Sequence, residues 1–288
     1  MPELPEVQAH AERLSAALGG TALQGFEPIT FTALKTFEPR PDKAVGVPLD
    51  GVGRRGKHLL LTHGELTFVV HLMQGGRLRF DEKQARRPRF GIARWRFADG
   101  RALLLTEQGT ERKAGVWVVA GDPLPRPPLD ELGPEADTIP AEQMAVLFAA
   151  HSMRVHTFLR DQRILAGLGR RLANEVCWSA RLSPFAQTRQ LGAEGAAAVV
   201  EAITATVADG LAHERARDDM SASKDRPGAV HRRTGEPCPR DATPIRAVEY
   251  TSYTVNYCPT CQTGGKILAD NTLSKFGIHD APPRARRR

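Results

Sequence analysis

The stretch that decides the fold stands at the start of the chain, MPELPEVQAHAERL at residues 1–14. Apolar residues recur there at helical spacing and stop before a Gly-Gly pair, which commonly ends a helix. They are Leu4, Val7, Ala11, Leu14 and Leu18. The spacing predicts a helix over 3–18. Two prolines and two glutamates make its first turn stiff, although chain ends usually fray.

This first turn also has a chemical interpretation. Removal of Met1 would make Pro2 the N-terminus, with a secondary amine on a rigid ring. An α-amino group has a pKa of about 7.7–8.0, so much of it is a nucleophile near neutral pH. The helix dipole favours ionised Glu3 beside it. Amine and carboxylate together could perform Schiff-base chemistry on a sugar. A proline-started helix with acidic residues is also common capping, and the motif alone favours that interpretation.

The composition favours an intracellular protein with a polyanionic partner. Lys and Arg number 40 against 33 Asp and Glu, giving a charge of +7. Such an excess suits nucleic acid. The first residues lack the pattern of a secretory signal, and no apolar run looks long enough to span a bilayer. We therefore expect no membrane partner. The RARRR stretch at 284–288 is interpreted as a solvated basic tail.

The order of patterns predicts an α+β protein. Two hairpins are expected, one at 58–72 turning at His63-Gly64 and one at 94–107 turning at Asp99-Gly100, with another strand at 115–121. With the first helix they predict a two-layer β-sandwich domain over 1–122. A proline-rich linker is expected at 123–140, a helical domain at 141–225, a cysteine-bearing ribbon at 226–270 and a basic tail at 271–288.

Three of the four cysteines cluster near the C-terminus. Cys258 and Cys261 are two residues apart, like half of a zinc knuckle. Upstream, Cys238 is followed at the matching spacing by Asp241 instead of a second cysteine. A zinc site with three thiolates and one carboxylate is therefore predicted. His231 is a second candidate for the fourth ligand, and a zinc-free hairpin held by packing is the alternative.

A glycine-rich loop precedes one of the predicted helices. Gly167 and Gly169 follow Asp161-Gln162 and lead into a helical pattern. Glycines permit a tight turn, and a following helix N-terminus can bind phosphate. An ordinary connection between two helices explains the same pattern and is favoured on this evidence alone.

Four motifs occur together in one order: MPELPE at 1–6, GRRGKHLLL at 53–61, DQRILAGLG at 161–169 and CPTCQ at 258–262. In this combination the chain resembles the formamidopyrimidine-DNA glycosylase/endonuclease VIII family, from residue 2 to about residue 265. PELPE resembles the formamidopyrimidine-glycosylase branch. The resemblance implies a helix on a β-sandwich, a helix-two-turn-helix domain and a zinc ribbon, with DNA in the cleft between domains.

The resemblance also implies a bifunctional DNA glycosylase and abasic-site lyase of base-excision repair. Pro2 would be the nucleophile, Glu3 would protonate the sugar, Glu6 would support it, and Lys57 would assist and reach the DNA backbone. Its partner would be damaged DNA with a flipped nucleotide. The enzyme would be monomeric, bacterial and cytoplasmic, associated with the nucleoid. The DNA-binding residues would be His71, Gln74, Arg112, His156, Arg170 and Asn174.

Several expected DNA contacts are changed. Arg170 replaces the phosphate-binding asparagine of the family. His156 stands in place of a lysine and Tyr253 in place of an arginine. Gln74 replaces the methionine that the family inserts into the DNA as a wedge. The stretch TEQGTERKAG at 106–115 lacks the aromatic residue of the family's corresponding loop. RPGAVHRRTG at 226–235 abbreviates the segment that caps the lesion. The groups for chemistry are retained, whereas the groups that read DNA differ.

This contrast predicts a divergent branch with a shifted substrate range. Oxidised pyrimidines, hydantoins and abasic sites are as suitable as 8-oxoguanine. The main alternative is a catalytically weak protein that binds damaged DNA. A zinc-ribbon transcription or RNA-binding factor is the third interpretation, in which the N-terminal motif is a coincidence.

Overall fold

The computed structural model describes residues 1–109, 112–221 and 225–268. Within it the chain forms two compact units. The first comprises residues 1–132 and 211–223, and the second comprises residues 133–210 and 224–288. The predicted basic tail at 271–288 lies outside the described residues.

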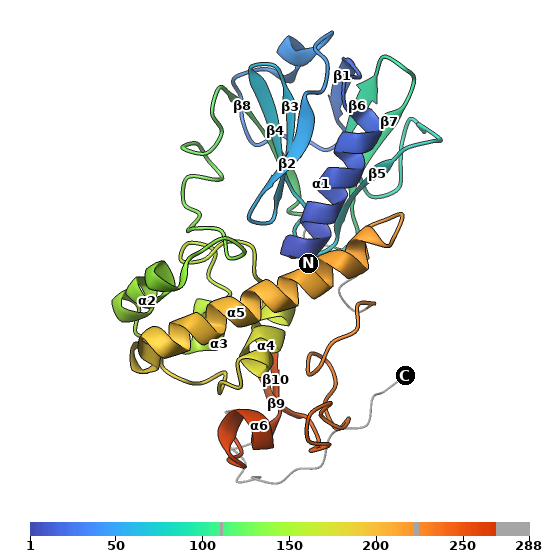
Figure 1. Ribbon diagram of the computed structural model, residues 1–288. Helices are drawn as coiled ribbons and strands as arrows, with labels where there is room; N and C mark the ends of the chain where they lie inside the picture. The colour runs from blue at the N-terminus through green and yellow to red at the C-terminus, as the bar shows by residue number, and fades with distance from the viewer. Residues whose placement is uncertain (110–111, 222–224, 269–288) are drawn as a thin grey trace. The chain divides into compact units, whose positions relative to one another are not determined.

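The first unit is a sandwich of two four-stranded antiparallel sheets (Figure 1). One sheet has the order β1 (Leu23–Pro28), β6 (Gly91–Phe97), β7 (Ala102–Glu107) and β5 (Gly76–Phe80). The other has the order β2 (Gly51–Arg55), β3 (His58–His63), β4 (Leu66–His71) and β8 (Gly115–Ala120). Apolar side chains alternate into the core. Trp95, Phe68 and Phe97 are fully buried there.

Helix α1 (Leu4–Leu18) lies against β2 and β5, the edge strands of the two sheets (Figure 1). Its apolar stripe, predicted from the spacing, is buried. Toward β2, the Oγ of Ser15 accepts a hydrogen bond from the N–H of Val52 at 3.2 Å. Toward β5, a ring nitrogen of His10 lies 2.7 Å from the carbonyl of Leu78. Contacts on both sides therefore fix the helix and its N-terminal turn.

The predicted hairpins are present, with one shift. The β3–β4 turn is centred on Gly64-Glu65 instead of His63-Gly64, since His63 pairs with Leu66. Gly64 adopts φ 55°, and its N–H donates to the carboxylate of Asp50 at 2.8 Å. The β6–β7 hairpin turns at Asp99-Gly100 as predicted, and the strand predicted at 115–121 is β8. A short 3-10 helix, η1 (Pro41–Ala44), precedes β2.

The second unit is helical, with a small hairpin. It contains α2 (Ala141–Ala150), α3 (Val155–Phe158), α4 (Arg170–Ser179) and most of α5 (Thr188–Arg215). The ribbon consists of β9 (Arg246–Glu249), β10 (Thr254–Tyr257) and α6 (Pro259–Thr263). The backbone of α5 is interrupted at Gly192, where φ is 59° and ψ is −163°.

The final residues of α5 belong to the first unit. There the guanidinium of Arg215 forms two hydrogen bonds, of 2.8 and 2.7 Å, with the carboxylate of Glu12 on α1. Glu214 is fully buried and accepts hydrogen bonds from the backbone N–H and the hydroxyl of Ser221. These polar contacts join the end of α5 and the following residues to α1.

Within the described residues, α5 is long and apolar enough by length and composition to cross a membrane, with a mean hydropathy of 1.4 in its best window. The sequence-based statement that no run reaches this length was therefore wrong. Its alanines and valines extend the apolar window. Buried core helices of soluble proteins meet the same criterion, so the finding is weak evidence for a membrane span.

Candidate active site and metal centre

The first turn of α1 brings two carboxylates to the helix N-terminus. Glu3 is the N-cap, and the side chains of Glu3 and Glu6 form a reciprocal capping box. The backbone N–H of Glu3 donates to Oε2 of Glu6 at 3.0 Å. Both carboxylates are buried, with Glu3 4% and Glu6 0% exposed.

Pro2 immediately precedes this capping box. It is buried, whereas Met1 is exposed. The N-terminal methionine is thus accessible for removal, and a proline nitrogen lies one residue from a carboxylate in a rigid turn. The structure brings Pro2, Glu3 and Glu6 together on one helix turn, as the sequence predicts.

Lys57 lies in the tight turn between β2 and β3 and is only 4% exposed. Gly56 provides the left-handed backbone of this turn, with φ 55°. Arg54 connects the turn with α1: its Nε donates to the amide oxygen of Gln8 at 3.0 Å, and its Nη1 donates to the carbonyl of Gly56 at 3.1 Å. The turn that carries Lys57 is therefore fixed against α1.

His71, a predicted DNA contact, pairs across the strands with His58. The ring centroids are 4.5 Å apart. Desolvation, together with the positive charge of Lys57, lowers the pKa of His71 to about 4. Desolvation is also the main cause that lowers the pKa of His58 to about 3. Both rings are neutral at pH 7, and Nδ1 of His71 accepts a hydrogen bond from the N–H of Met73 at 3.2 Å.

The other two predicted DNA contacts of the first unit are surface residues. Gln74 is exposed in the connection before β5, and Arg112 is exposed shortly before β8. Both positions suit a macromolecular partner.

In the second unit, a side-chain brace shapes the loop before α4. The amide of Gln162 donates to the carbonyls of Arg160 and Leu168 at 2.9 and 2.8 Å and accepts the N–H of Gly167 at 3.0 Å. Arg170, the first residue of α4, donates from Nη1 to the carbonyl of Ser252 at 2.8 Å. The glycine loop is therefore a shaped element, and Arg170 connects α4 with the β9–β10 turn.

His156 and Asn174 lie in the interior, with 2% and 0% exposure. His156 stacks on Tyr253 at 6.3 Å between ring centroids. Desolvation and, to a smaller extent, the charge of Arg160 lower the pKa of His156 to about 3. The side chain of Asn174 is 2.9 Å from Nδ1 of His231 and accepts the N–H of Asn256 at 3.3 Å. Both residues therefore join α3 and α4 to the ribbon.

Sequence reasoning missed the role of Glu175. Its buried carboxylate accepts hydrogen bonds from the N–H groups of Ala229, Val230 and His231 at 2.8, 3.2 and 2.8 Å. A Cβ at Gly228 would lie 2.6 Å from Oε1 of Glu175, so a larger residue there would displace this carboxylate. Glu175 thus organises part of the segment 226–235. A charged residue in the middle of the amphipathic pattern of α4 was the available signal.

Four side chains of the ribbon could hold a metal ion: Cys238, Asp241, Cys258 and Cys261, whose ligand atoms all lie within 4.8 Å of one another. The Sγ atoms of Cys238 and Cys261 are 4.0 Å apart, and Sγ of Cys258 is 3.3 Å from a carboxylate oxygen of Asp241. Tetrahedral zinc spaces sulfur and oxygen ligands about 3.5–3.8 Å apart, so the four atoms fit.

The alternative fourth ligand, His231, is outside this group. Its Nδ1 is engaged by Asn174 at 2.9 Å. Partial desolvation raises the pKa of Asp241, but hydrogen bonds, chiefly from the N–H of Thr243, more than offset this effect, so the pKa lies below its usual value. Cys177 is not a candidate metal ligand, because it lies outside the group of four and burial raises the pKa of its thiol to about 12.

Comparisons with known protein families identify the class of protein to which this chain belongs. Residues 1–117 match the formamidopyrimidine-DNA glycosylase N-terminal domain, and residues 132–220 match the formamidopyrimidine-DNA glycosylase H2TH domain. The chain belongs to the formamidopyrimidine-DNA glycosylase family. The resemblance inferred from the four motifs and the predicted fold class are confirmed.

Several relatives are similar to this chain in sequence. A formamidopyrimidine-DNA glycosylase of Thiobacillus denitrificans is 31% identical, over 91% of this chain and 100% of the relative. One of Deinococcus radiodurans is 30% identical, over 91% and 97%. An uncharacterised formamidopyrimidine-DNA glycosylase-like protein of Mycobacterium tuberculosis is 35% identical over 160 residues, covering 55% of this chain and 99% of the relative.

Solved structures support the fold. The Lactococcus lactis enzyme bound to DNA with an abasic site superposes with a TM-score of 0.79 at 23% identity, over 91% of this chain and 100% of that one. Its complex with N7-benzyl-Fapy-dG DNA gives 0.81 at 22% identity, with the same coverage.

Proposed function

We propose that this chain is a bifunctional DNA glycosylase and abasic-site lyase of base-excision repair, with Pro2 as the nucleophile. Membership of the glycosylase family supports DNA repair as the process and damaged DNA as the partner. The observation that carries the finer assignment is the N-terminus of α1, where buried Pro2 directly precedes a buried capping box formed by Glu3 and Glu6.

Removal of Met1 converts the nitrogen of Pro2 into a secondary amine. Its lone pair forms a bond to the anomeric carbon C1′, and the bond from C1′ to the damaged base breaks. The base leaves with the bonding electrons and takes up a proton from water. Ring opening then breaks the C1′–O4′ bond and leaves an iminium between proline and sugar.

Glu3 is suited to receive the proton that the amine loses and to deliver it to O4′, since its carboxyl group is adjacent to the amine along the chain. The amine loses its own proton as the iminium forms. Glu6 keeps the turn in shape through its bond to the N–H of Glu3. The iminium acidifies the C2′ proton, and loss of that proton expels the 3′-phosphate. Hydrolysis then regenerates the amine.

Lys57 supplies a fixed positive charge for the DNA backbone. It lies in a turn that Arg54 connects with α1, so its position is set relative to the catalytic turn.

The ribbon would hold one structural zinc ion through Cys238, Asp241, Cys258 and Cys261, whose donor atoms fit. Zinc bound there would stabilise the fold of the ribbon and take no part in the reaction. Cys238 is oriented by Trp178, whose indole N–H donates to its sulfur at 3.4 Å.

We further propose that the domains follow the predicted division, except for the end of α5, which belongs to the first unit, and that α4 contributes Arg170 to phosphate binding. An arginine can replace an asparagine there, because its guanidinium forms charge-assisted bonds with phosphate. The rearranged contacts favour a substrate range of oxidised pyrimidines, hydantoins and abasic sites beside 8-oxoguanine.

A lesion panel tests this function. The protein, with Met1 removed, is incubated with duplexes that contain 8-oxoguanine, 5-hydroxycytosine, a hydantoin or an abasic site. Base release and strand cleavage are followed separately. Release of at least one oxidised base with cleavage is expected. Binding of these duplexes without either reaction would support the alternative, a damage-binding protein.

A further inference from the structure

Three connections of the β-sandwich meet at one end of its β1–β6–β7–β5 sheet. The register pairs Gly76 with Glu107 and Gly91 with Thr106, so the starts of β5 and β6 lie beside the end of β7. The chain next to each strand contains a non-glycine residue in the left-handed region: Met73 at φ 50°, Phe90 at 59° and Arg112 at 42°. Such backbone is unfavourable for side-chain-bearing residues and is concentrated at functional sites.

Phe90 is the most unusual of the three. It is the third residue of a tight turn in which the N–H of Gly91 donates to the carbonyl of Pro88 at 3.2 Å. A positive φ at that position is the pattern of a type II turn, which favours glycine or asparagine there. The N–H of Glu107 on β7 donates to the carbonyl of Phe90 at 3.1 Å. A bulky ring is therefore held where glycine would cost less.

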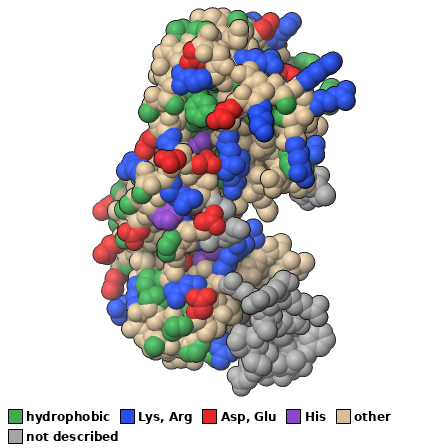
Figure 2. Space-filling view, turned by 90° about the vertical axis from the view of Figure 1, so that its right-hand side faces the viewer, with side chains coloured by type: hydrophobic (Ala, Val, Ile, Leu, Met, Phe, Trp, Pro, Cys, Tyr) green, Lys and Arg blue, Asp and Glu red, His purple; other side chains and the backbone are tan. Residues whose placement is uncertain are grey.

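The ring of Phe90 is surrounded by positive charge. The guanidinium of Arg89 lies 4.7 Å from its centroid and that of Arg112 lies 5.9 Å away. Arg86 and Arg87 are exposed in the same segment, while Phe90 itself is half-buried. Lys and Arg side chains are prominent on the part of the sandwich visible in Figure 2. An aromatic ring among arginines is a typical platform for stacking nucleic-acid bases.

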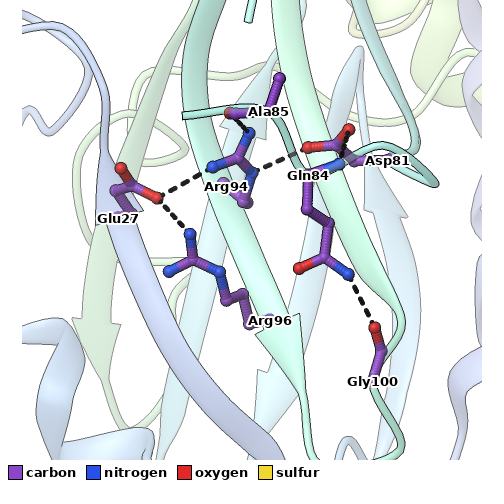
Figure 3. Close-up of polar contacts among 7 residues, drawn as sticks. All are labelled: Glu27, Asp81, Gln84, Ala85, Arg94, Arg96 and Gly100. Atoms are coloured by element: carbon purple, nitrogen blue, oxygen red, sulfur yellow. Dashed lines mark hydrogen bonds and ion pairs between the residues drawn. The ribbon is translucent and has the colours of Figure 1, made fainter. Parts of the chain in front are cut away.

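The connection between β5 and β6, which ends at Phe90, is anchored by the buried side chain of Arg94 on β6 (Figure 3). Arg94 is fully buried and donates to the carboxylate of Asp81 at 2.8 Å and to the carbonyl of Ala85 at 2.7 Å. Its third partner is Glu27 at 3.1 Å. The side chain of Gln84 adds a hydrogen bond to the carbonyl of Gly100 at 2.8 Å. These bonds hold residues 81–85 of the connection, and the same connection ends at the strained Phe90 directly before β6.

We propose that Phe90 is the side chain that stacks in the gap left in duplex DNA by the extruded nucleotide. This rests on the proposed function. The stretch 106–115 lacks an aromatic residue of its own. Phe90 reaches the same end of the sheet from a different connection. An apolar ring can fill an unstacked base step. Arg89 and Arg112 contribute charge for the flanking phosphates.

The test compares binding to two probes that both contain a tetrahydrofuran abasic analogue, one in a duplex and one in a single strand. Only the duplex has a gap to fill. Phe90→Ala is expected to bind the duplex about tenfold more weakly, as loss of one base-stacking contact predicts, and to bind the single strand as the wild type does. Phe90→Trp should restore the affinity. Phe80→Ala, an exposed phenylalanine at the far end of β5, is the matched control.

Measuring the melting temperature together with the duplex affinity distinguishes a loss of DNA stacking from a loss of stability. Phe90→Gly removes the ring but suits the positive φ, so its melting temperature should equal or exceed that of the wild type, while its duplex affinity falls like that of Phe90→Ala. Unchanged duplex affinity in both variants would overturn the proposal, as would equal losses for both probes. The assay needs no catalysis, so failure of base release in the lesion panel would count against the proposed function and not against Phe90.

Discussion

Two regions differ in how much of the family motif they retain. One is the N-terminal turn of α1. The other, called here the α4–ribbon region, comprises α3, α4 and the ribbon of the second unit. In the turn, Pro2, Glu3 and Glu6 match the motif and are buried, and Glu3 and Glu6 form a reciprocal capping box. In the α4–ribbon region, three expected DNA contacts are replaced by His156, Arg170 and Tyr253. The reacting atoms of a sugar permit few substitutions, whereas a phosphate can be bound by any well-placed cation.

The replacements in the α4–ribbon region fit one another. His156 stacks on Tyr253, and the guanidinium of Arg160 lies 4.0 Å from the centroid of the same tyrosine. Arg170 donates to the carbonyl of Ser252, the residue before Tyr253. A neutral stacked pair thus occupies two positions where the family has cations, while Arg170 and Arg160 provide charge nearby. The replaced positions are in contact with one another or with neighbouring residues.

The largest effect is expected at the N-terminal turn. Glu3→Gln removes the proton donor but retains hydrogen bonding and shape, so base release should fall about 10²–10⁴-fold, the usual contribution of general acid–base catalysis. Single-turnover kinetics on the preferred lesion measure it. Glu12→Gln, on the exposed face of the same helix, is the matched control and should react like the wild type. A Glu3→Gln variant with normal rates would remove Glu3 from the mechanism.

The ribbon should show the next largest effect. Asp241→Ala removes a ligand, so zinc retention against a chelator should weaken by more than the 10–100-fold that is typical of losing an outer partner of a metal ligand. Metal content and thermal unfolding are measured together. Asp241→Cys should retain zinc more tightly. His231→Ala serves as the control, and zinc loss in that variant alone would transfer the fourth position to His231.

The buried position of His156 predicts a pH effect. Its pKa is about 3 in the folded protein against about 6.5 unfolded, so the unfolded state binds more protons between these values. Stability is therefore complete above about pH 6.5 and falls toward pH 3, by up to about 1.4 kcal/mol per pH unit.

His156→Phe keeps a ring for the stack but cannot titrate. Thermal unfolding from pH 7 to pH 4 should show a shallower loss for this variant than for the wild type. Parallel curves would mean that His156 is solvated, which would return it to the DNA-contact surface.

The smallest effect concerns Arg170. Arg170→Ala should reduce the slope of log affinity against log salt by about 0.9, the contribution of one phosphate contact, with a loss of a few-fold in affinity at moderate salt. Fluorescence anisotropy with undamaged duplex measures it. Arg181→Ala, after the other end of α4, is the control. An unchanged slope would show that Arg170 makes no phosphate contact and has only a structural role through its hydrogen bond to Ser252.

Much of the fold could be predicted from the sequence, because local patterns determine it. The spacing of Leu4, Val7 and Leu14 predicted α1, and the Asp99-Gly100 dipeptide marked its hairpin. The short helices α3 and α6 were missed, since one turn carries little periodicity. The association of residues 211–223 with the first unit was also missed, because it depends on tertiary contacts such as that between Arg215 and Glu12.

The site was predictable where it forms a continuous motif. Pro2, Glu3 and Glu6 lie within one turn, and the metal group follows from cysteine spacing. Burial of His156 and Asn174 could not be anticipated, because their partners Tyr253 and His231 are distant in sequence. The same holds for Phe90, whose neighbour Arg112 approaches only through the register of β6 and β7.

The central claim is that the nitrogen of Pro2 forms a covalent bond with DNA. Borohydride trapping on an oligonucleotide with an abasic site tests it most directly, comparing the protein after removal of Met1 with Pro2→Gly and with a form extended before Pro2. A stable protein–DNA adduct is expected for the mature protein, a weak one for Pro2→Gly and none for the extended form. Equal trapping by the extended form, or no adduct with the mature protein, would contradict it.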